Sequence, residues 1–224
     1  FGFGFGDQSD IRVKAARNNW LTTDTLFNGQ YARSFTQSFT GRSTLEPFTS
    51  CRIELNVQRN FTRNQTESYR INANTGEYNA FNSLDGGSFS ITTITWRTAF
   101  VKNNKDYTNE TFTQFTNNRA IISQRLGLLN PYSTGQDSTG FWDGYSGTNP
   151  QVLAGAFLSA YRGKNAANIN LNYFPTIPLP NWRITYDGLT KMAWSKKIFQ
   201  NFQLSHAYRS TYNVNAYNTN LQWS

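Results

Sequence analysis

The sequence is poor in the side chains from which proteins build reactive and metal-binding centres. It contains one cysteine, Cys51, and one histidine, His206, among 224 residues. A disulfide within the chain needs two cysteines, and a structural zinc site uses about four Cys or His ligands. Both are therefore excluded within this chain. We predict no catalytic residue, no cofactor-binding residue and no metal ligand, and hence no enzyme.

The sequence also lacks a long apolar run. No stretch approaches the ~20 apolar residues that a membrane-spanning helix needs. Two classes of protein remain: a soluble protein, or one that enters a membrane through β-strands only. The chain opens on Phe1 rather than on Met, and we expect it to be either a processed protein or a piece of a longer one.

Aromatic residues are abundant instead. Phe, Tyr and Trp make up 16% of the chain, although its mean hydropathy is −0.61. Disordered chains are poor in aromatics, so a folded protein is expected. Aromatic-rich, polar β sequence suits a membrane barrel, in which one strand face meets lipid and the other a wet lumen. Carbohydrate-binding β-sandwiches share this composition.

The basic residues are spread singly along the chain. The net charge is +8, but only Lys196 and Lys197 stand next to each other. A nucleic-acid-binding protein would gather basic side chains on one face or helix. We therefore expect a polar surface or channel wall and no nucleic-acid partner.

The clearest predicted strand covers residues 51–61, where polar and apolar side chains alternate with period two. Such a strand would present one face to the lumen of a barrel and the other to lipid. The predicted lumen-facing residues are Arg52, Glu54, Asn56 and Gln58. The predicted lipid-facing residues are Ile53, Leu55 and Val57. We expect Cys51 to be a buried small residue in register with Ile53, and His206 to be structural.

The other predicted elements divide the chain into four parts. Residues 1–50 are expected to be an irregular lead-in, with a strand end at Phe1–Phe5 and a short helix from Ser9-Asp10 to Trp20. A strand pair follows in 51–103, with turns at Asn74-Thr75-Gly76 and Asp85-Gly86-Gly87 and a second strand at 88–101. Residues 104–164 are a predicted helical loop insertion, with helices at 107–128 and 149–162, the latter capped by Asn149. Residues 165–224 hold further strands at 167–173, 182–186 and 202–214.

Five or six strands are too few for a closed membrane barrel, which needs at least about eight. The predicted fold class is therefore mainly β: a segment of an antiparallel transmembrane β-barrel with a few short helices in its loops. The aromatic residues Phe141, Trp142 and Tyr145, in the Gly-rich loop between the helices, could bind sugars, form part of an aromatic girdle or dock on a partner.

Short runs along nearly the whole chain resemble one family. The longest is LPNWRITYDGL at residues 179–189, followed by WSKKIF at 194–199 and LSHAYRSTY at 204–212. Earlier runs are FGFG at 3–6, SDIR at 9–12, NWLT at 19–22, EPF at 46–48, RIEL at 52–55 and GSFS at 87–90. These runs resemble the SprA/Sov family, the very large outer-membrane translocon of the type IX secretion system in gliding and periodontal Bacteroidota.

The resemblance implies an internal slice of a much longer barrel in the outer membrane of a Gram-negative, Bacteroidota-type bacterium. It implies export of folded cargo proteins through the barrel lumen to the cell surface. The implied partners are secreted cargo, a plug protein, a cargo shuttle barrel, periplasmic and lipoprotein subunits, and membrane lipid. The residues themselves leave two alternatives: a soluble carbohydrate-binding or adhesion module, and a segment of another large outer-membrane transporter barrel.

Overall fold

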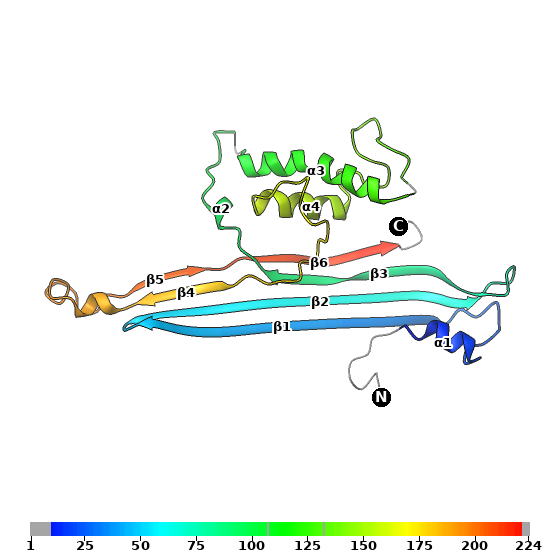
Figure 1. Ribbon diagram of the computed structural model, residues 1–224, viewed down its shortest axis with the longest axis horizontal. Coiled ribbons are helices and arrows are strands. Elements are labelled where there is room, and N and C mark those ends of the chain that lie inside the picture. The colour runs from blue at the N-terminus through cyan, green and yellow to red at the C-terminus, as the bar shows by residue number, and fades with distance from the viewer. Residues whose placement is uncertain (1–9, 107, 132, 221–224) are drawn as a thin grey trace. The chain divides into compact units, whose positions relative to one another are not determined.

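The computed structural model describes residues 10–106, 108–131 and 133–220 (Figure 1). The predicted strand end at Phe1–Phe5 and the resemblance run at 3–6 lie outside the described residues. The described part is mainly β with a few helices, which confirms the coarse fold class. It forms two compact units. One holds the described parts of residues 1–38, 60–90 and 213–224; the other holds residues 39–59 and 91–212.

Six strands form a single sheet, and each strand whose pairing register is resolved runs antiparallel to its neighbour. They are β1 (Gln30–Phe48), β2 (Cys51–Ile71), β3 (Tyr78–Thr92), β4 (Asn181–Tyr186), β5 (Leu204–Tyr208) and β6 (Thr211–Asn220). The helices are α1 (Arg12–Arg17), α2 (Trp96–Ala99), α3 (Glu110–Leu129) and α4 (Pro150–Tyr161), with a 3-10 turn η2 (Gly188–Lys191).

The sheet is open. Its order is β5-β4-β2-β3-β6, and β1 pairs with β2 alone among the described strands. The edge of β2 opposite β1 is shared by β4 and β3, so β2 has neighbours on both sides. The outer edges of β1 and of the β5 and β6 strands have no neighbour within the described part of the chain. The described strands therefore do not close into a barrel.

Residues 93–180 contain α2, α3, α4 and their connecting loops, and they interrupt one row of the sheet. We call them the insertion. The chain leaves the sheet after Thr92 and returns at Leu179, whose amide donates to the Thr92 carbonyl at 3.0 Å. The Thr92 hydroxyl accepts from the Gln58 amide at 3.1 Å and so continues the pairing with β2 across the junction. On the other side, the Asn181 side chain accepts from the Ser210 amide at 2.9 Å. β4 thus resumes the row that β3 leaves.

Both longer predicted helices are confirmed. The Asn109 side chain accepts from the Phe112 amide at the start of α3, and the Asn149 side chain accepts from the Gln151 amide at the start of α4. Pro150 is the first residue of α4, where its missing N–H costs nothing. Gly163 follows the helix with φ +61°, the left-handed conformation that favours glycine at a helix end.

The prediction of an irregular lead-in over residues 1–50 is wrong from Gln30 onward, where the 19-residue strand β1 begins. Its polar residues carry little period-two signal, and tertiary pairing decides its conformation. The Ser34 hydroxyl donates to the Asn64 side chain at 2.8 Å, and Ser38 donates to Asn60 at 2.9 Å. The short helix near the N-terminus is real, but it ends at Arg17 rather than Trp20.

Three further strand predictions need correction. The strand expected at 88–101 ends at Thr92, where the insertion begins. Residues 167–173 are not a strand. Here Asn side chains accept hydrogen bonds from backbone amides two residues later, as Asn170 does from the Asn172 amide at 2.8 Å. The single strand expected at 202–214 is divided into β5 and β6 by Arg209-Ser210.

One of the two predicted turns is correct. Gly76 has φ +70°, and the Asn72 amide donates to the Glu77 carbonyl in the β2–β3 turn. Gly86 and Gly87 instead lie inside β3. A Cβ atom on Gly87 would stand 1.9 Å from the carbonyl oxygen of Thr62. This glycine therefore serves a close backbone approach rather than a turn.

We predict that Gly87→Ala destabilises the protein by roughly 3 kcal/mol or more, because the new methyl group meets backbone atoms that cannot move aside. The measurement is urea-induced unfolding, followed by circular dichroism. Ser88→Ala, at the next position of β3, is the control and should stay within about 1 kcal/mol of the parent. Equal midpoints for the two variants would contradict the close approach.

Candidate functional site

The register of three strands gives the sheet two chemically different faces. Arg52 pairs with Thr185, Glu54 with Arg183 and Asn56 with Asn181, and β4 then pairs Arg183 with Ala207 and Thr185 with Ser205. Directly paired residues point to the same side of an antiparallel sheet. We call this side the polar face: Arg52, Glu54, Asn56, Asn181, Arg183, Thr185, Ser205 and Ala207.

The alternate residues form the opposite side. Cys51 pairs with Tyr186, Ile53 with Ile184 and Leu55 with Trp182; Tyr186, Ile184 and Trp182 then pair with Leu204, His206 and Tyr208. We call this side the apolar face; it consists of these nine residues. Aliphatic and aromatic side chains thus occupy every position of this face except Cys51 and His206.

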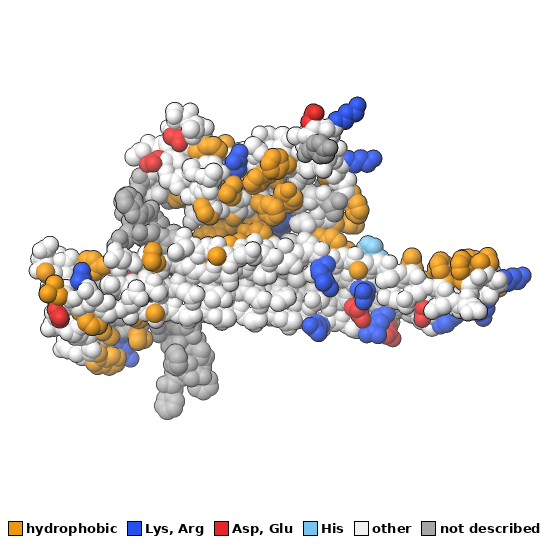
Figure 2. All heavy atoms as spheres, turned by 180° about the vertical axis from the view of Figure 1, so that it is seen from behind, with side chains coloured by type: hydrophobic (Ala, Val, Ile, Leu, Met, Phe, Trp, Pro, Cys, Tyr) orange, Lys and Arg blue, Asp and Glu red, His pale blue; other side chains and the backbone are white. Residues whose placement is uncertain are grey.

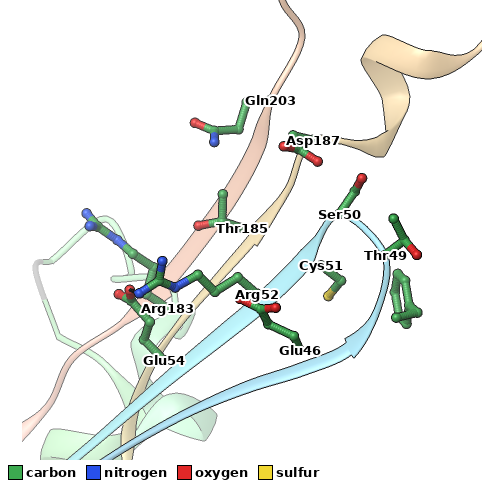
Figure 3. Close-up of a pocket in the computed structure, with 11 residues that line it drawn as sticks. Glu46, Thr49, Ser50, Cys51, Arg52, Glu54, Arg183, Thr185, Asp187 and Gln203 are labelled. Atoms are coloured by element: carbon green, nitrogen blue, oxygen red, sulfur yellow. Dashed lines mark ion pairs between the residues drawn. The ribbon is translucent and has the colours of Figure 1, made fainter.

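The polar face is hollowed at the end where β1 turns into β2 (Figure 3). The hollow has a volume of about 720 Å³ and opens widely to solvent. Its charged lining residues are Glu46, Arg52, Glu54, Arg183 and Asp187. Figure 3 shows Arg52, Glu54 and Arg183 gathered from β2 and β4, with Gln203 and Asp187 on the far side of the hollow. Both signs of charge are therefore mixed along one wet surface.

The charges of the polar face are solvated rather than buried. Arg52 Nη2 lies 3.1 Å from Glu54 Oε1, and the two side chains are 57% and 43% exposed. An exposed pair of this kind contributes about 0–1 kcal/mol to stability. This ion pair is therefore accessible to water rather than desolvated.

The ion pair between Arg12 and Glu67, in contrast, is largely buried from solvent. Arg12, at the start of α1, bonds to Glu67 of β2, whose side chain is only 1% exposed. Ser83 of β3 also donates to Glu67, at 2.8 Å. Hydrogen bonds from the Arg12 side chain hold the pKa of Asp10 below its ordinary value. This cluster fastens α1 to β2 and β3.

The apolar face carries a ladder of rings. Trp182 stacks on Tyr208 with centroids 4.5 Å apart, and Tyr186 meets Phe48 edge-on at 6.0 Å. Trp182 Nε1 donates to His206 Nδ1 at 3.3 Å. The predicted burial of Cys51 is confirmed, since 7% of it is exposed. Leu204, by contrast, is 58% exposed and Phe48 60%, so no described segment covers this end of the face.

The two sets of predicted wall residues are separated as the alternation requires. Arg52, Glu54 and Asn56 lie on the polar face, and Ile53 and Leu55 lie on the apolar face. Gln58 and Val57 are the next residues of β2, beside the junction with the insertion. The alternation of Trp182, Ile184 and Tyr186 predicted the strand that became β4, but the predicted wall residues all lie on β2 and include none of β4 or β5. Sequence reasoning thus missed Arg183, which the register brings opposite Glu54.

The insertion has its own core, built between α3 and α4 around Ile122, Ala156 and Ala166. The Ser123 hydroxyl holds the loop between the helices: it accepts from the Trp142 amide at 2.9 Å and donates to the Tyr145 carbonyl at 2.6 Å. Phe141, Trp142 and Tyr145 are half-buried. Trp142 packs so closely on α3 that a Cβ on Gly127 would lie 2.6 Å from its ring. Trp142 is thus a packing residue.

No set of three or more His, Cys, Asp or Glu side chains in the described residues could hold a metal ion. None of the helices in the described part of the chain is long and apolar enough to cross a bilayer. The sequence matches no protein-family model and no curated protein. The two-faced sheet is therefore the feature from which a function can be argued.

We predict that removing the arginine of each ion pair changes the free energy of unfolding by very different amounts. Arg52→Ala should change the free energy of unfolding by less than about 1 kcal/mol, because its partner Glu54 stays hydrated. Arg12→Ala should cost about 3–5 kcal/mol, because it leaves the carboxylate of Glu67 buried with its charge uncompensated. Urea titration of both variants and the parent protein provides the comparison. A larger loss for Arg52→Ala would mean that the polar face is a structural element rather than a functional surface.

Proposed function

We propose that this chain is a segment of the wall of a protein-conducting outer-membrane channel, of the kind that the resemblance to the SprA/Sov family implies. Folded cargo proteins would pass along its polar face on their way to the cell surface. The apolar face would meet the acyl chains of the bilayer. The observation that carries the proposal is an open sheet in which β2, β4 and β5 together present one polar face and one apolar face.

The dimensions of the apolar face support a membrane wall. Along β2 it extends from Cys51 through Leu55, and Val57 continues the alternation. These residues span about 20 Å at roughly 3.3 Å per residue, close to the ~25 Å apolar band of a membrane barrel. The strands are also long: β1 has 19 residues and β2 has 21, against the ~9–11 that cross a bilayer.

The unpaired edges of the sheet also support a membrane wall. A long edge strand offers a row of unpaired N–H and C=O groups to any other strand, and a barrel removes this liability by closure. Within hydrocarbon, each unpaired backbone group would cost several kcal/mol. Further strands beside β1 and beside the β5 and β6 row would satisfy these groups and complete a wall.

The alternative of a soluble adhesion module fits the apolar face less well. A β-sandwich covers its inner face with a second sheet. All six described strands belong to one sheet, and Leu204 and Phe48 remain more than half exposed. The mixed charges of the hollow also suit a wet lumen better than a sugar site, which would present a flat aromatic platform.

The proposed channel has no bond-making chemistry of its own, and its partners are cargo, plug, shuttle barrel, periplasmic and lipoprotein subunits, and lipid.

The test is photo-cross-linking from neighbouring residues of β2 in cells that export cargo. A photoreactive amino acid at position 54, on the polar face, should capture exported proteins that carry a C-terminal secretion signal. The same amino acid at position 53, on the apolar face, is the matched control and should capture lipid and no exported protein.

Exported cargo captured equally at both positions, or at neither, would contradict the proposed wall. Capture only of proteins that bind small nutrients would favour another transporter barrel. Recovery of the protein free of membranes, with binding to polysaccharide, would favour the adhesion module.

A further inference from the structure

Residues 188–203, which follow Asp187 in the connection between β4 and β5, expose large apolar side chains at the end of the apolar face. Trp194 is 53% exposed and Ile198 is 70% exposed. Met192, Phe199 and Leu204 are exposed as well. Figure 2 shows hydrophobic side chains gathered beside basic ones at the end of the molecule where β4 and β5 meet. We call residues 188–203 the β4–β5 loop.

The loop is internally well ordered. Thr190 closes its base, donating from its hydroxyl to the Phe202 carbonyl at 2.9 Å and accepting from the Phe202 amide at 3.0 Å. Ser195 is fully buried, and its hydroxyl donates to the Leu189 carbonyl. The Phe199 amide donates to the Ser195 carbonyl at 2.8 Å. The backbone is thus satisfied from within, while the apolar side chains point outward.

The rings of the loop support one another. Phe199 stacks on Phe202 with centroids 5.1 Å apart, and Trp194 meets Phe202 edge-on at 6.5 Å. Moving such an exposed apolar surface from water into an apolar environment is favourable, roughly in proportion to its area. A prebuilt apolar surface therefore favours an apolar environment over solvent.

The charge of the loop specifies that environment further. Residues 188–203 contain Lys191, Lys196 and Lys197, and the one acidic residue of the whole connection, Asp187, lies at its base next to β4. Lys191 Nζ donates to the Ser50 hydroxyl at 2.6 Å, which ties the loop to the β1–β2 turn. Aromatic and aliphatic side chains interleaved with lysines match the boundary between acyl chains and anionic headgroups.

We propose that the β4–β5 loop is an interfacial anchor that rests on an anionic lipid surface. Trp194, Ile198 and Phe199 enter the headgroup–acyl boundary, and Lys196 and Lys197 bind lipid phosphates. The loop would then fix the depth at which the apolar face sits in the bilayer. This inference rests on the proposed membrane location and adds to it a particular anchor and lipid charge.

The experiment measures depth with nitroxide spin labels on single cysteines in a Cys51→Ser background, with the full protein reconstituted in vesicles. Labels at Ile198→Cys and at Asn201→Cys compare an apolar and a polar position of the same loop. Labels at Leu204→Cys and Ser205→Cys report the two faces of β5. Accessibility to oxygen, which partitions into lipid, is compared with accessibility to a water-soluble nickel complex.

In vesicles of four parts phosphatidylcholine to one part phosphatidylglycerol, the label at 198 should favour oxygen, about 5–10 Å below the headgroups. The label at 201 should favour nickel. Replacing Lys196 and Lys197 by Gln, or omitting phosphatidylglycerol, should shift the label at 198 toward water.

The outcomes separate the two proposals. Oxygen accessibility at 204 together with nickel accessibility at 198 in both vesicles would overturn the anchor and leave the wall intact. Exclusion of both reagents at 198 would mean a protein contact, which also overturns the anchor. Nickel accessibility at both 204 and 205 would overturn the membrane wall itself.

Discussion

The hydrogen-bonding capacity of the sheet edges is the constraint on which the rest of this structure depends. β2 is paired on both sides, whereas β1 and the β5 and β6 row have a neighbour on one side only within the described residues. Long unpaired strand edges are costly in lipid and prone to association in water. Either the edges meet further strands, or the sheet must be protected in another way. A wall that continues beyond these strands answers both the edge problem and the exposure of the apolar face.

The junction around Thr92 explains how the sheet can carry a helical insertion without losing its strand pairing. The chain leaves one row of the sheet and returns to it eighty-seven residues later at Leu179, with a backbone hydrogen bond between the two points. Thr92 and Asn181 use side-chain atoms to maintain pairing where two strands meet end to end. The insertion supplies its own core, and the Phe157 ring of α4 stacks on Tyr212 of β6 at 6.0 Å. A bulky helical element can thus be added to this sheet through a gap in a single row.

Sequence reasoning predicted the features that depend on local signals. The alternation of residues 51–57 separates Arg52 from Ile53, and Asn149-Pro150 marks the start of α4. It failed where tertiary contacts decide. β1 has polar residues on both faces and is fixed by pairing to β2, Gly87 looks like a turn residue but makes room for Thr62, and Asn170 favours a side-chain turn over the expected strand. The pairing of Glu54 with Arg183 links positions far apart in sequence, and no local pattern predicts it.

The most direct test of the account is hydrogen exchange of the backbone amides of β1 in the protein reconstituted in lipid vesicles. Along an edge strand, alternate N–H groups point toward the neighbouring strand and away from it. If the wall continues past β1, both sets of amides should exchange slowly and at similar rates. Fast exchange of the outward set, with slow exchange of the set that faces β2, would show that β1 is a true edge and would contradict the account.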